Sequence, residues 1–436
     1  MRSTMTQQTA TQQTATRQPT SEQPTSVPLI DVNRQFVELE AELIEALRRV
    51  AASGRFVLGP DCQVLEESLA RYCAVPHAIG CASGSDALLL ALMAADVGPG
   101  DEVIVPSYTF FATASAVARL GAKPVFVDID RHSYNLDPEA VAAAIAPATK
   151  AVIPVHLYGQ CAEMDPLVEL GRKHGLTIIE DAAQAIGAEL AGRRAGALAD
   201  IGCFSFYPTK NLGGFGDGGF LTTRDDRLAE RLRLLRVHGM QPRYHHQILG
   251  INSRLDSLQA AVLNVKLPHL DRWTAQRQAH AARYGELFAT TGLAGYVGLP
   301  QALPDRRHVW NQYVIRIPGL ARDPLRTYLT EQKIGTEIYY PIPLHKQPCF
   351  AHLGYRDGQL PQTEWAAAET LALPIFPELT VAEQEMVVNR IGVFFGTVSP
   401  TGHVGPPAPK FLESGRRKAE GGAGNAESRF SDRKGG

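Results

Sequence analysis

The sequence predicts an α/β protein in which helices cover a mostly parallel sheet and a smaller C-terminal α/β domain follows. Three observations favour this fold class. Short apolar runs rich in valine and isoleucine alternate with helical patterns through the first half of the chain. The pattern changes after about residue 245. The chain has 436 residues, of which 44% are hydrophobic and 20% charged, so it can bury a large core and is long enough for two domains.

The elements of the first half follow from their periodicity. Apolar side chains recur every three or four residues from Arg34 to Ala52, which is typical of one helical face and predicts an N-terminal helix. Further helical patterns start near Asp86 and near Asp137. The runs expected to form strands are HAIGCAS, EVIVPS, KPVFVDID, KAVIPVHLY, LTIIED, DIGCFSFY and GGFLTT. In such sheets ligands gather beyond the carboxyl ends of the strands, so the polar residues that end these runs are candidates for a functional site.

The second half of the chain has a different organisation. A long helix is expected from Asp256 through Leu267, with a continuation beyond Pro268. Mixed short segments then follow up to Phe395. This change of pattern indicates a second, smaller domain.

Four regions are therefore predicted. A large domain occupies residues 27–245 and a smaller one residues 246–397. Residues 1–26 consist almost entirely of Thr, Gln, Ser and Pro, and residues 398–436 are rich in Gly, Pro and charge. Such compositions bury too little apolar surface to offset the entropy lost on ordering, so both ends are predicted to be disordered tails.

Composition argues against several classes of function. Forty-three Lys and Arg against 45 Asp and Glu give a formal net charge of −2, which offers no electrostatic footprint for nucleic acid or an anionic membrane. The six cysteines include no C-x-x-C pair, so neither a zinc site nor a disulfide framework is implied, and a cytoplasmic protein is expected. The longest apolar stretch, residues 87–95, is far below the roughly 18 to 20 residues of a membrane helix. A small-molecule partner is therefore expected.

Two residues suggest the chemistry. The run LTIIED ends in Asp181, and Lys210 follows 29 residues later in a glycine-rich loop. Pyridoxal phosphate needs a lysine amine for a Schiff base and a carboxylate that keeps its ring nitrogen protonated. Each residue alone has a simpler interpretation, because a lysine is usually a solvated charge and an aspartate at a strand end is often a helix cap.

Gly84 and Ser85 are candidates for holding a phosphate. They lie between a predicted strand and a predicted helix, where free backbone amides and the positive end of the helix favour an anion.

The loop from Gly213 to Gly219 lacks the strand, turn and helix order of a dinucleotide-binding fingerprint. The spacing of the histidines at 238, 245 and 246 fits no common metal motif, so no catalytic metal is expected.

Eight strings extend this interpretation. They are GRFVLGP, CASGSDALLLAL, VPSYTFFATASA, EDAAQAIGA, FSFYPTKNLGG, RVHG, GINSRLDSLQAAVL and YYPIPLHKQPCF. In these strings and their order the chain resembles the DegT/StrS group of nucleotide-sugar aminotransferases, which are fold-type I pyridoxal phosphate enzymes. The resemblance runs from about residue 28 to residue 395.

The resemblance implies a role for each matching position. Lys210 is expected to form the Schiff base, and Asp181 to pair with the ring nitrogen of the cofactor. Gln184 is expected near the phenolic oxygen, on the same side as Asp181 if the strand runs directly into a helix. The remaining cofactor contacts implied are Gly84, Ser85 and Ser205 at the phosphate, Phe110 stacked on the ring, and Asn252 reaching the phosphate from a neighbouring subunit. A homodimer with shared active sites follows from the last of these.

The expected reaction moves an amino group from an amino acid, with L-glutamate as the expected donor, to a keto sugar of a nucleoside diphosphate. Related sugar dehydratases have histidine at the position of Lys210, so the lysine favours transamination. The strings most resemble enzymes that aminate dTDP-3-keto-6-deoxyhexoses for antibiotic or surface glycans. Tyr340 and His345 are candidates for lining the sugar or nucleotide pocket, and a structural role is equally open for both.

Other functions remain open at this point. Amination at C4 or of a cyclitol ketone is compatible with the same strings. A non-catalytic protein with the cofactor fold could serve as a ligand sensor, although such a protein would be expected to lose Lys210, Asp181 or the phosphate loop first. A cysteine desulfurase would need a reactive loop cysteine, and Cys349 is the only candidate, in a context that resembles the sugar enzymes.

Overall fold

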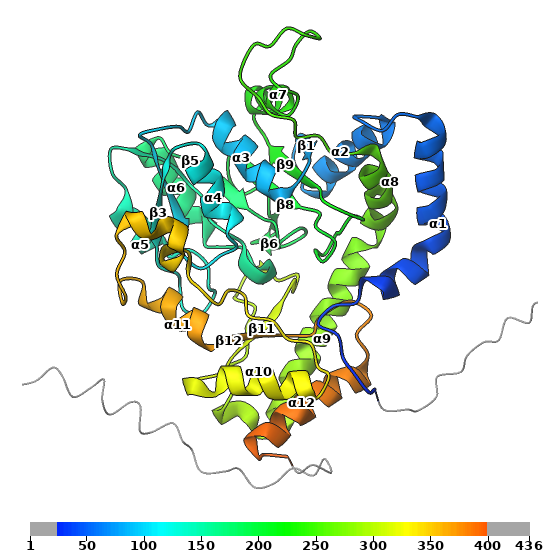
Figure 1. Cartoon of the computed structure of the whole chain (residues 1–436), viewed down its shortest axis with the longest axis vertical. Helices are drawn as coiled ribbons and strands as arrows, with labels where there is room; N and C mark the ends of the chain where they lie inside the picture. The colour runs from blue at the N-terminus through cyan, green and yellow to red at the C-terminus, as the bar shows by residue number, and fades with distance from the viewer. Residues whose placement is uncertain (1–23, 399–436) are drawn as a thin grey trace, which may run out of the picture.

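A computed structural model of the chain describes residues 24–398 (Figure 1). Apart from residues 24–26 and 398, the two predicted tails lie outside the described residues. The order of elements is the expected one, with helices and strands alternating before a long helical segment and a mixed C-terminal part.

The chain begins with two helices that pack beside the main sheet. Helix α1 (Val32–Ser53) starts at Asp31, whose side chain accepts a hydrogen bond from the backbone N–H of Asn33, and confirms the predicted N-terminal helix. Its buried face, which includes Leu39 and Leu43, packs against Val262 and Trp273 from the second half of the chain. Helix α2 (Pro60–Tyr72) follows.

A seven-stranded sheet forms the centre of the molecule, in the order β1-β9-β8-β5-β4-β2-β3. The strands β2, β3, β4, β5 and β8 are parallel to their neighbours within that set, and β9 runs antiparallel to both β8 and β1. The predicted mostly parallel sheet is thus confirmed. The strand bounds are β1 His77–Cys81, β2 Glu102–Pro106, β3 Lys123–Val127, β4 Thr149–Val152, β5 Thr177–Asp181, β8 Ile201–Ser205 and β9 Gly219–Thr223.

Helices cover both faces of this sheet. Side chains that alternate along a strand enter opposite cores: Ile178 belongs to the cluster that includes α2 and α6, whereas Ile179 belongs to the cluster with α3 and α4. The near-continuous burial of the strands reflects this two-sided cover. The bounds are α3 Gly84–Ala94, α4 Ala112–Arg119, α5 Pro138–Ala144, α6 Met164–His174 and α7 Asp226–Leu235.

The C-terminal part builds a core of its own around a two-stranded sheet. Strands β11 (Tyr313–Arg316) and β12 (Thr370–Leu373) pair antiparallel, and an apolar cluster between them and the helices includes Tyr284, Leu325 and Ile391. The long predicted helix is realised as α8 (Ser257–Lys266), a short 3-10 turn containing Pro268, and α9 (Leu270–Thr290). The remaining bounds are β6 Glu189–Leu190, β7 Arg193–Arg194, β10 Arg306–Arg307, α10 Arg322–Glu331, α11 Pro361–Glu369 and α12 Val381–Phe395.

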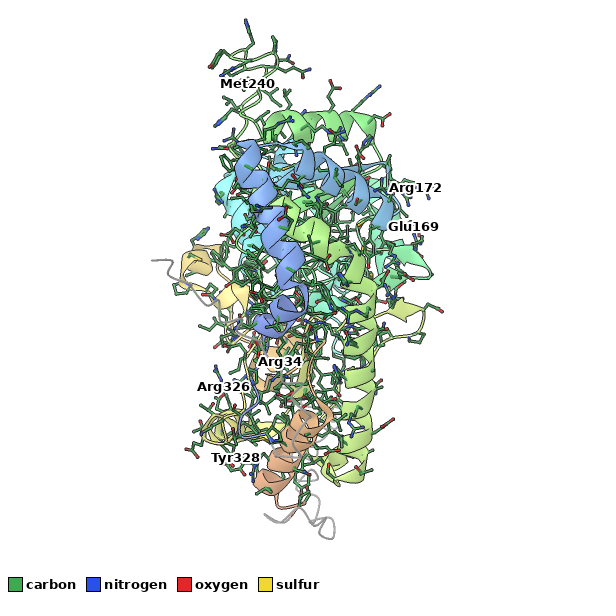
Figure 2. All side chains as sticks on the ribbon, turned by 90° about the vertical axis from the view of Figure 1, so that its right-hand side faces the viewer. Arg34, Glu169, Arg172, Met240, Arg326 and Tyr328 are labelled. Atoms are coloured by element: carbon green, nitrogen blue, oxygen red, sulfur yellow. The ribbon has the colours of Figure 1, made fainter. Side chains whose placement is uncertain are left out.

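The predicted domain boundary between residues 245 and 246 stays a prediction. Helix α8 packs on α1 and α2, and its residues Ala260 and Leu263 belong to the core beneath the large sheet. Between α7 and α8 the chain projects away from the helices, with Met240 in this projection (Figures 1 and 2). In residues 24–398 no helix is long and apolar enough to cross a membrane.

Candidate active site

Asp181 is the last residue of β5, at the carboxyl edge of the sheet, and is 5% exposed. The hydroxyl of Thr113 donates a hydrogen bond to its Oδ2 at 2.8 Å, and the backbone N–H of Ala183 donates to its Oδ1 at 3.2 Å. Burial raises the pKa of the Asp181 carboxyl, and these hydrogen bonds and the charge of Lys210 oppose that rise. The group is thus a buried carboxylate supported by specific donors.

Lys210 lies in the loop after β8, where its backbone N–H donates to the carbonyl of Tyr207 at 2.8 Å. Desolvation lowers the pKa of its amine to about 8, although the negative charge of Asp181 acts in the opposite direction. The structure therefore brings Lys210 and Asp181 close enough for each to affect the ionisation of the other. With a pKa of about 8, about a tenth of the amine is neutral at pH 7, and the neutral form is the one that acts as nucleophile or base.

The start of α3 lies directly against the end of β8. A Cβ atom on Gly84 would come within 2.7 Å of the Ser205 Cβ, so only glycine allows this approach without displacement. Ser83 caps the helix by accepting from the N–H of Asp86, and Ser85 lies in the first turn. The Ser205 Oγ accepts from the N–H of Tyr207 at 3.2 Å, so its own O–H can still donate. These groups together can cradle an anion.

Gln184 does not lie on a helix. Residues 182–188 form consecutive turns, so the condition under which Gln184 is expected beside Asp181, a strand that runs directly into a helix, is not met. The backbone here is fixed by tertiary contact, because the N–H of Ala182 donates to the carbonyl of Cys203. The Gln184 side chain is buried and bridges two segments: its Oε1 accepts from the N–H of Tyr158 at 2.7 Å, and its Nε2 donates to the hydroxyl of Tyr340 at 3.1 Å.

Phe110 is 56% exposed and is not a residue of the core. Its ring centroid lies 6.0 Å from that of Tyr340, which in turn lies 6.3 Å from that of Tyr108. Burial raises the pKa of the Tyr340 hydroxyl, and the charge of Asp181 raises it further. Tyr340 therefore lies near both Asp181 and Gln184, with Phe110 presenting an open aromatic face beside it.

The other two predicted site residues, His345 and Asn252, have contacts of their own. His345 is buried, its Nδ1 is 2.7 Å from the Oγ of Ser107, and its backbone N–H donates to the same oxygen at 3.1 Å. These contacts fit the structural role that the sequence left open for His345. Asn252 is exposed and forms an isolated bridge with Val237 at the base of the projecting segment.

A buried strap of backbone, residues 309–311, was not anticipated from the sequence. The Asn311 Nδ2 donates to the Oδ1 of Asn211 at 2.7 Å, and the Asn211 Nδ2 donates to the carbonyl of Val309 at 2.8 Å. The backbone N–H of Asn311 donates to the carbonyl of Tyr158 at 2.9 Å. The strap thus connects Asn211, which follows Lys210 in the chain, to Tyr158, whose backbone N–H binds the Gln184 side chain.

Two further features fix the strap. Gly159 has φ +103°, and a Cβ there would lie 2.8 Å from a Val309 methyl, so the backbones approach closely only because this residue is glycine. The guanidinium of Arg277 on α9 donates to the carbonyls of Trp310 and Ile375. The sequence offers no signal for this contact, because Asn211 and Asn311 are 100 residues apart.

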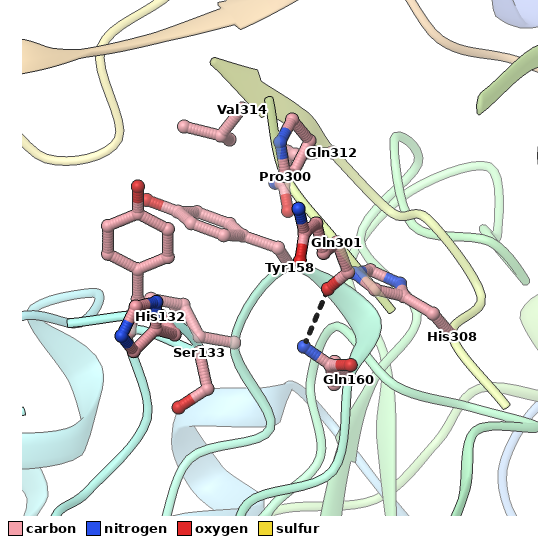
Figure 3. Close-up of a pocket in the computed structure, with 11 residues that line it drawn as sticks. His132, Ser133, Tyr158, Gln160, Pro300, Gln301, His308, Gln312 and Val314 are labelled. Atoms are coloured by element: carbon pink, nitrogen blue, oxygen red, sulfur yellow. Dashed lines mark hydrogen bonds between the residues drawn. The ribbon is translucent and has the colours of Figure 1, made fainter. Parts of the chain in front are cut away.

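A small cavity lies beside the strap (Figure 3). It is lined by Tyr158, His308 and Gln312 among others, and the Nε2 of Gln160 donates to the carbonyl of Gln301 across it at 3.4 Å. Its volume of about 10 Å³ leaves room for one water molecule. Neither a cofactor nor a sugar can bind in this cavity, which therefore belongs to the support of the site.

The residues at the edge of the sheet fit pyridoxal phosphate. The chain offers an amine of lowered pKa in Lys210, a buried carboxylate in Asp181, an anion cradle at Gly84 and Ser205, and an open aromatic face in Phe110. In residues 24–398 no group of three His, Cys, Asp or Glu side chains is arranged to hold a metal ion. The expectation that no metal takes part in catalysis stays a prediction.

Comparison with known proteins places this geometry in context. The model of the DegT/DnrJ/EryC1/StrS aminotransferase family matches residues 37–392. A Geobacillus stearothermophilus protein named "pleiotropic regulatory protein" is 52% identical over 370 residues, which is 85% of this chain and 99% of the relative. The "dTDP-3-amino-3,4,6-trideoxy-alpha-D-glucose transaminase" of Streptomyces venezuelae is 47% identical over 84% of this chain and 95% of its own length.

The fold is shared with solved structures. The crystal structure of S. venezuelae DesV in complex with a ketimine intermediate superposes with a TM-score of 0.81 at 47% sequence identity. The match covers 85% of this chain and 98% of the DesV chain. Sequence and structural comparisons therefore agree over nearly the whole described part of the chain.

Proposed function

This chain belongs to the DegT/DnrJ/EryC1/StrS aminotransferase family, and from that premise we propose that it aminates a dTDP-3-keto-6-deoxyhexose with L-glutamate as the amino donor. At the coarser level it is a pyridoxal-phosphate-dependent aminotransferase of nucleotide sugars with the fold-type I architecture. The finer substrate rests on three relatives named as dTDP-3-amino-sugar transaminases, at 47%, 42% and 41% identity. Other relatives are named for UDP or GDP sugars.

The observation that supports catalysis best is the proximity of Lys210 to Asp181, which ends β5 at the carboxyl edge of the sheet. When bound, pyridoxal phosphate supplies an aldehyde that captures amines and a ring that accepts electrons. In our proposal Lys210 would hold the cofactor covalently until the amine of the donor replaces it, and the released, neutral Nζ would then accept the α-proton of the donor. Its lowered pKa, about 8, keeps that form available near neutral pH. The negative charge of Asp181 would favour the protonated form of the cofactor's ring nitrogen.

The remaining residues bind and orient in this proposal. The backbone N–H groups at Gly84 and Ser85 and the hydroxyl of Ser205 hold the phosphate. Phe110 packs against one face of the ring. Gln184, fixed by Tyr158 and Tyr340, donates toward the phenolic oxygen, and Tyr340 also borders the space in which the sugar binds. For Tyr340 the support is its position beside Phe110 and Gln184.

The substrate proposal is tested by product analysis. The purified holoenzyme is incubated with L-glutamate and, in separate reactions, with dTDP-3-keto-6-deoxyglucose, a dTDP-4-keto-6-deoxyhexose and a UDP-3-keto sugar. Formation of amino sugar is followed by mass and of 2-oxoglutarate by a coupled assay. We expect the dTDP-3-keto sugar to give the largest kcat/KM. A larger value for the UDP or the 4-keto substrate would contradict the finer proposal and leave the aminotransferase activity intact.

A homodimer with shared active sites is part of this proposal. Asn252 is exposed at the base of a projecting segment, a position from which a side chain can reach a second copy of the chain. Mixing the inactive variants Lys210→Ala and Asn252→Ala tests this arrangement. If Asn252 acts in the partner's site, a mixed dimer contains one complete site, and activity returns on mixing. No recovery, although two differently tagged variants co-purify as mixed dimers, would contradict the shared site.

A non-catalytic function as a ligand sensor is not adopted. Two relatives carry regulatory names, the Geobacillus protein and, at 46% identity, the "erythromycin biosynthesis sensory transduction protein EryC1" of Saccharopolyspora erythraea. This chain nevertheless retains Lys210, Asp181 and the anion cradle, which a sensor would not need to preserve together. A response of the cofactor spectrum to an amino donor separates the two functions.

A further inference from the structure

The carboxylate of Asp181 is held by a residue that the mechanism above does not use. Thr113 lies in the first turn of α4, is 0% exposed, and directs its Oγ1 to the Asp181 Oδ2 at 2.8 Å. A buried hydroxyl that donates to a carboxylate stabilises the charged form and restricts its rotation. The other hydrogen bond recorded to this carboxylate in the described part of the chain is the longer one from Ala183, at 3.2 Å.

The segment that carries Thr113 also carries Phe110. The backbone N–H of Thr113 donates to the carbonyl of Phe110 at 3.3 Å, and the Oγ1 of Thr109 lies 3.3 Å from the Thr113 Oγ1. One short segment after β2 therefore presents an aromatic face and a hydroxyl donor to the same site. A change in the position of α4 would move both groups together.

The charged and titratable groups around Asp181 come from several elements. Lys210 and His156 lower the pKa of the carboxyl, and Tyr340 and Cys203 lie close enough for the Asp181 charge to raise their own pKa values. The neighbouring Glu180 accepts hydrogen bonds from the backbone N–H groups of 196, 198 and 199 and from His156 instead. Thr113 is thus the side-chain hydroxyl that bonds Asp181 directly.

We propose that Thr113 is a positioning residue that orients the Asp181 carboxylate toward the cofactor ring and keeps it charged. This inference rests on the proposed function, because it takes Asp181 to be the partner of the ring nitrogen. Without the hydroxyl, the charged form of the buried Asp181 carboxylate is less stable, so the ring nitrogen of the cofactor would be protonated less often. The cofactor ring then carries less positive charge near Lys210. The nitrogen that would join Lys210 to the cofactor therefore keeps its proton up to a higher pH.

Three variants test the proposal. Thr113→Val removes the hydroxyl at nearly constant volume, Thr113→Ser restores it, and Thr109→Val is the matched control because it removes a neighbouring buried hydroxyl that does not touch Asp181. The readout is the pH midpoint at which the visible band of the holoenzyme gives way to its near-ultraviolet form. We expect the midpoint to rise by about 1 pH unit in Thr113→Val and to stay within about 0.2 unit of wild type in the other two.

The rate at which L-glutamate decreases the absorbance of the visible band is measured on the same samples. We expect it to fall about tenfold or more in Thr113→Val and to be largely retained in Thr113→Ser. An unchanged midpoint in a Thr113→Val protein that reacts normally with glutamate would overturn the role of Thr113 and leave the proposed function standing. A wild-type protein that forms no visible band with pyridoxal phosphate would overturn both. If Thr113→Val fails to fold, Thr113→Ala removes the same hydroxyl: a midpoint raised by about 1 pH unit in that variant supports the proposal, and a wild-type midpoint and rate overturn it.

Discussion

At the scale of the residue, Lys210 and Asp181 illustrate how burial prepares two ordinary side chains for chemistry. Burial lowers the pKa of the lysine and raises that of the aspartate, and the attraction between their charges opposes both shifts. As a result, the Lys210 amine is neutral for part of the time, and the hydrogen-bond donors of the Asp181 carboxylate favour its charged form. The strand patterns place Asp181 at a strand end and Lys210 in a following loop, whereas the roles predicted for the two residues come from the family resemblance.

The pH dependence of cofactor capture follows from the lysine. Only the neutral amine attacks an aldehyde, and its pKa is lowered from 10.5 to about 8, so the rate of capture by cofactor-free protein should rise with pH and level off above about 8. Borohydride trapping followed by peptide mass spectrometry reports capture at Lys210 itself. A rate that keeps rising up to pH 10 would show that the amine has an ordinary lysine pKa.

Replacing Asp181 by Asn keeps the shape of the side chain and removes its charge. We expect the holoenzyme to retain the cofactor, since Lys210 and the phosphate cradle are unchanged, and to react with L-glutamate about 100-fold or more slowly because the ring nitrogen loses its partner. Stopped-flow absorbance measures this half-reaction without any sugar substrate. A wild-type rate would remove Asp181 from the mechanism.

At the scale of the element, sequence patterns predicted the strands and helices but not the connections between them. The start of α3 and the end of β5 follow from local periodicity and capping, so Gly84 and Asp181 could be located in advance. The turns after Asp181 depend on tertiary contacts, such as that of Ala182 with Cys203, and the helix on which the expected position of Gln184 was conditional does not form there. The pair Asn211 and Asn311 is separated by 100 residues, a distance at which no periodic signal exists.

The strap makes a testable contribution at this scale. Asn311→Ala leaves the buried Oδ1 of Asn211 without its donor, so the free energy of unfolding should fall by about 1 to 3 kcal/mol and the affinity for pyridoxal phosphate should fall with it. Urea unfolding and cofactor titration measure the two effects. Asn264→Ala is the matched control, because Asn264 donates to the carbonyl of Asp61 where α8 meets α2.

The comparison between the two variants decides the role of the strap. We expect Asn264→Ala to lose stability without losing affinity for the cofactor. Equal losses of affinity in both variants would mean that the strap supports the fold in general and not the loop of Lys210 in particular.

At the scale of the whole molecule, the site exists because parallel strands bring their carboxyl ends to one edge. Asp181 ends β5 and Ser205 ends the neighbouring β8, and the loops beyond them meet the start of α3. The alternation of strands and helices made this arrangement predictable. The close association of α8 with α1 and α2 was not, since it depends on side chains such as Leu43 and Val262 that meet across more than 200 residues of sequence.

The whole molecule works as a pyridoxal-phosphate-dependent aminotransferase, and this activity is tested by the visible spectrum of the purified holoenzyme before and after addition of L-glutamate. We predict a band at about 410 to 430 nm that moves toward the near ultraviolet as 2-oxoglutarate forms, and a Lys210→Ala protein without that band. A protein that stays colourless when supplied with pyridoxal phosphate, or whose band is unchanged by glutamate and every other common amino acid, would contradict the claim.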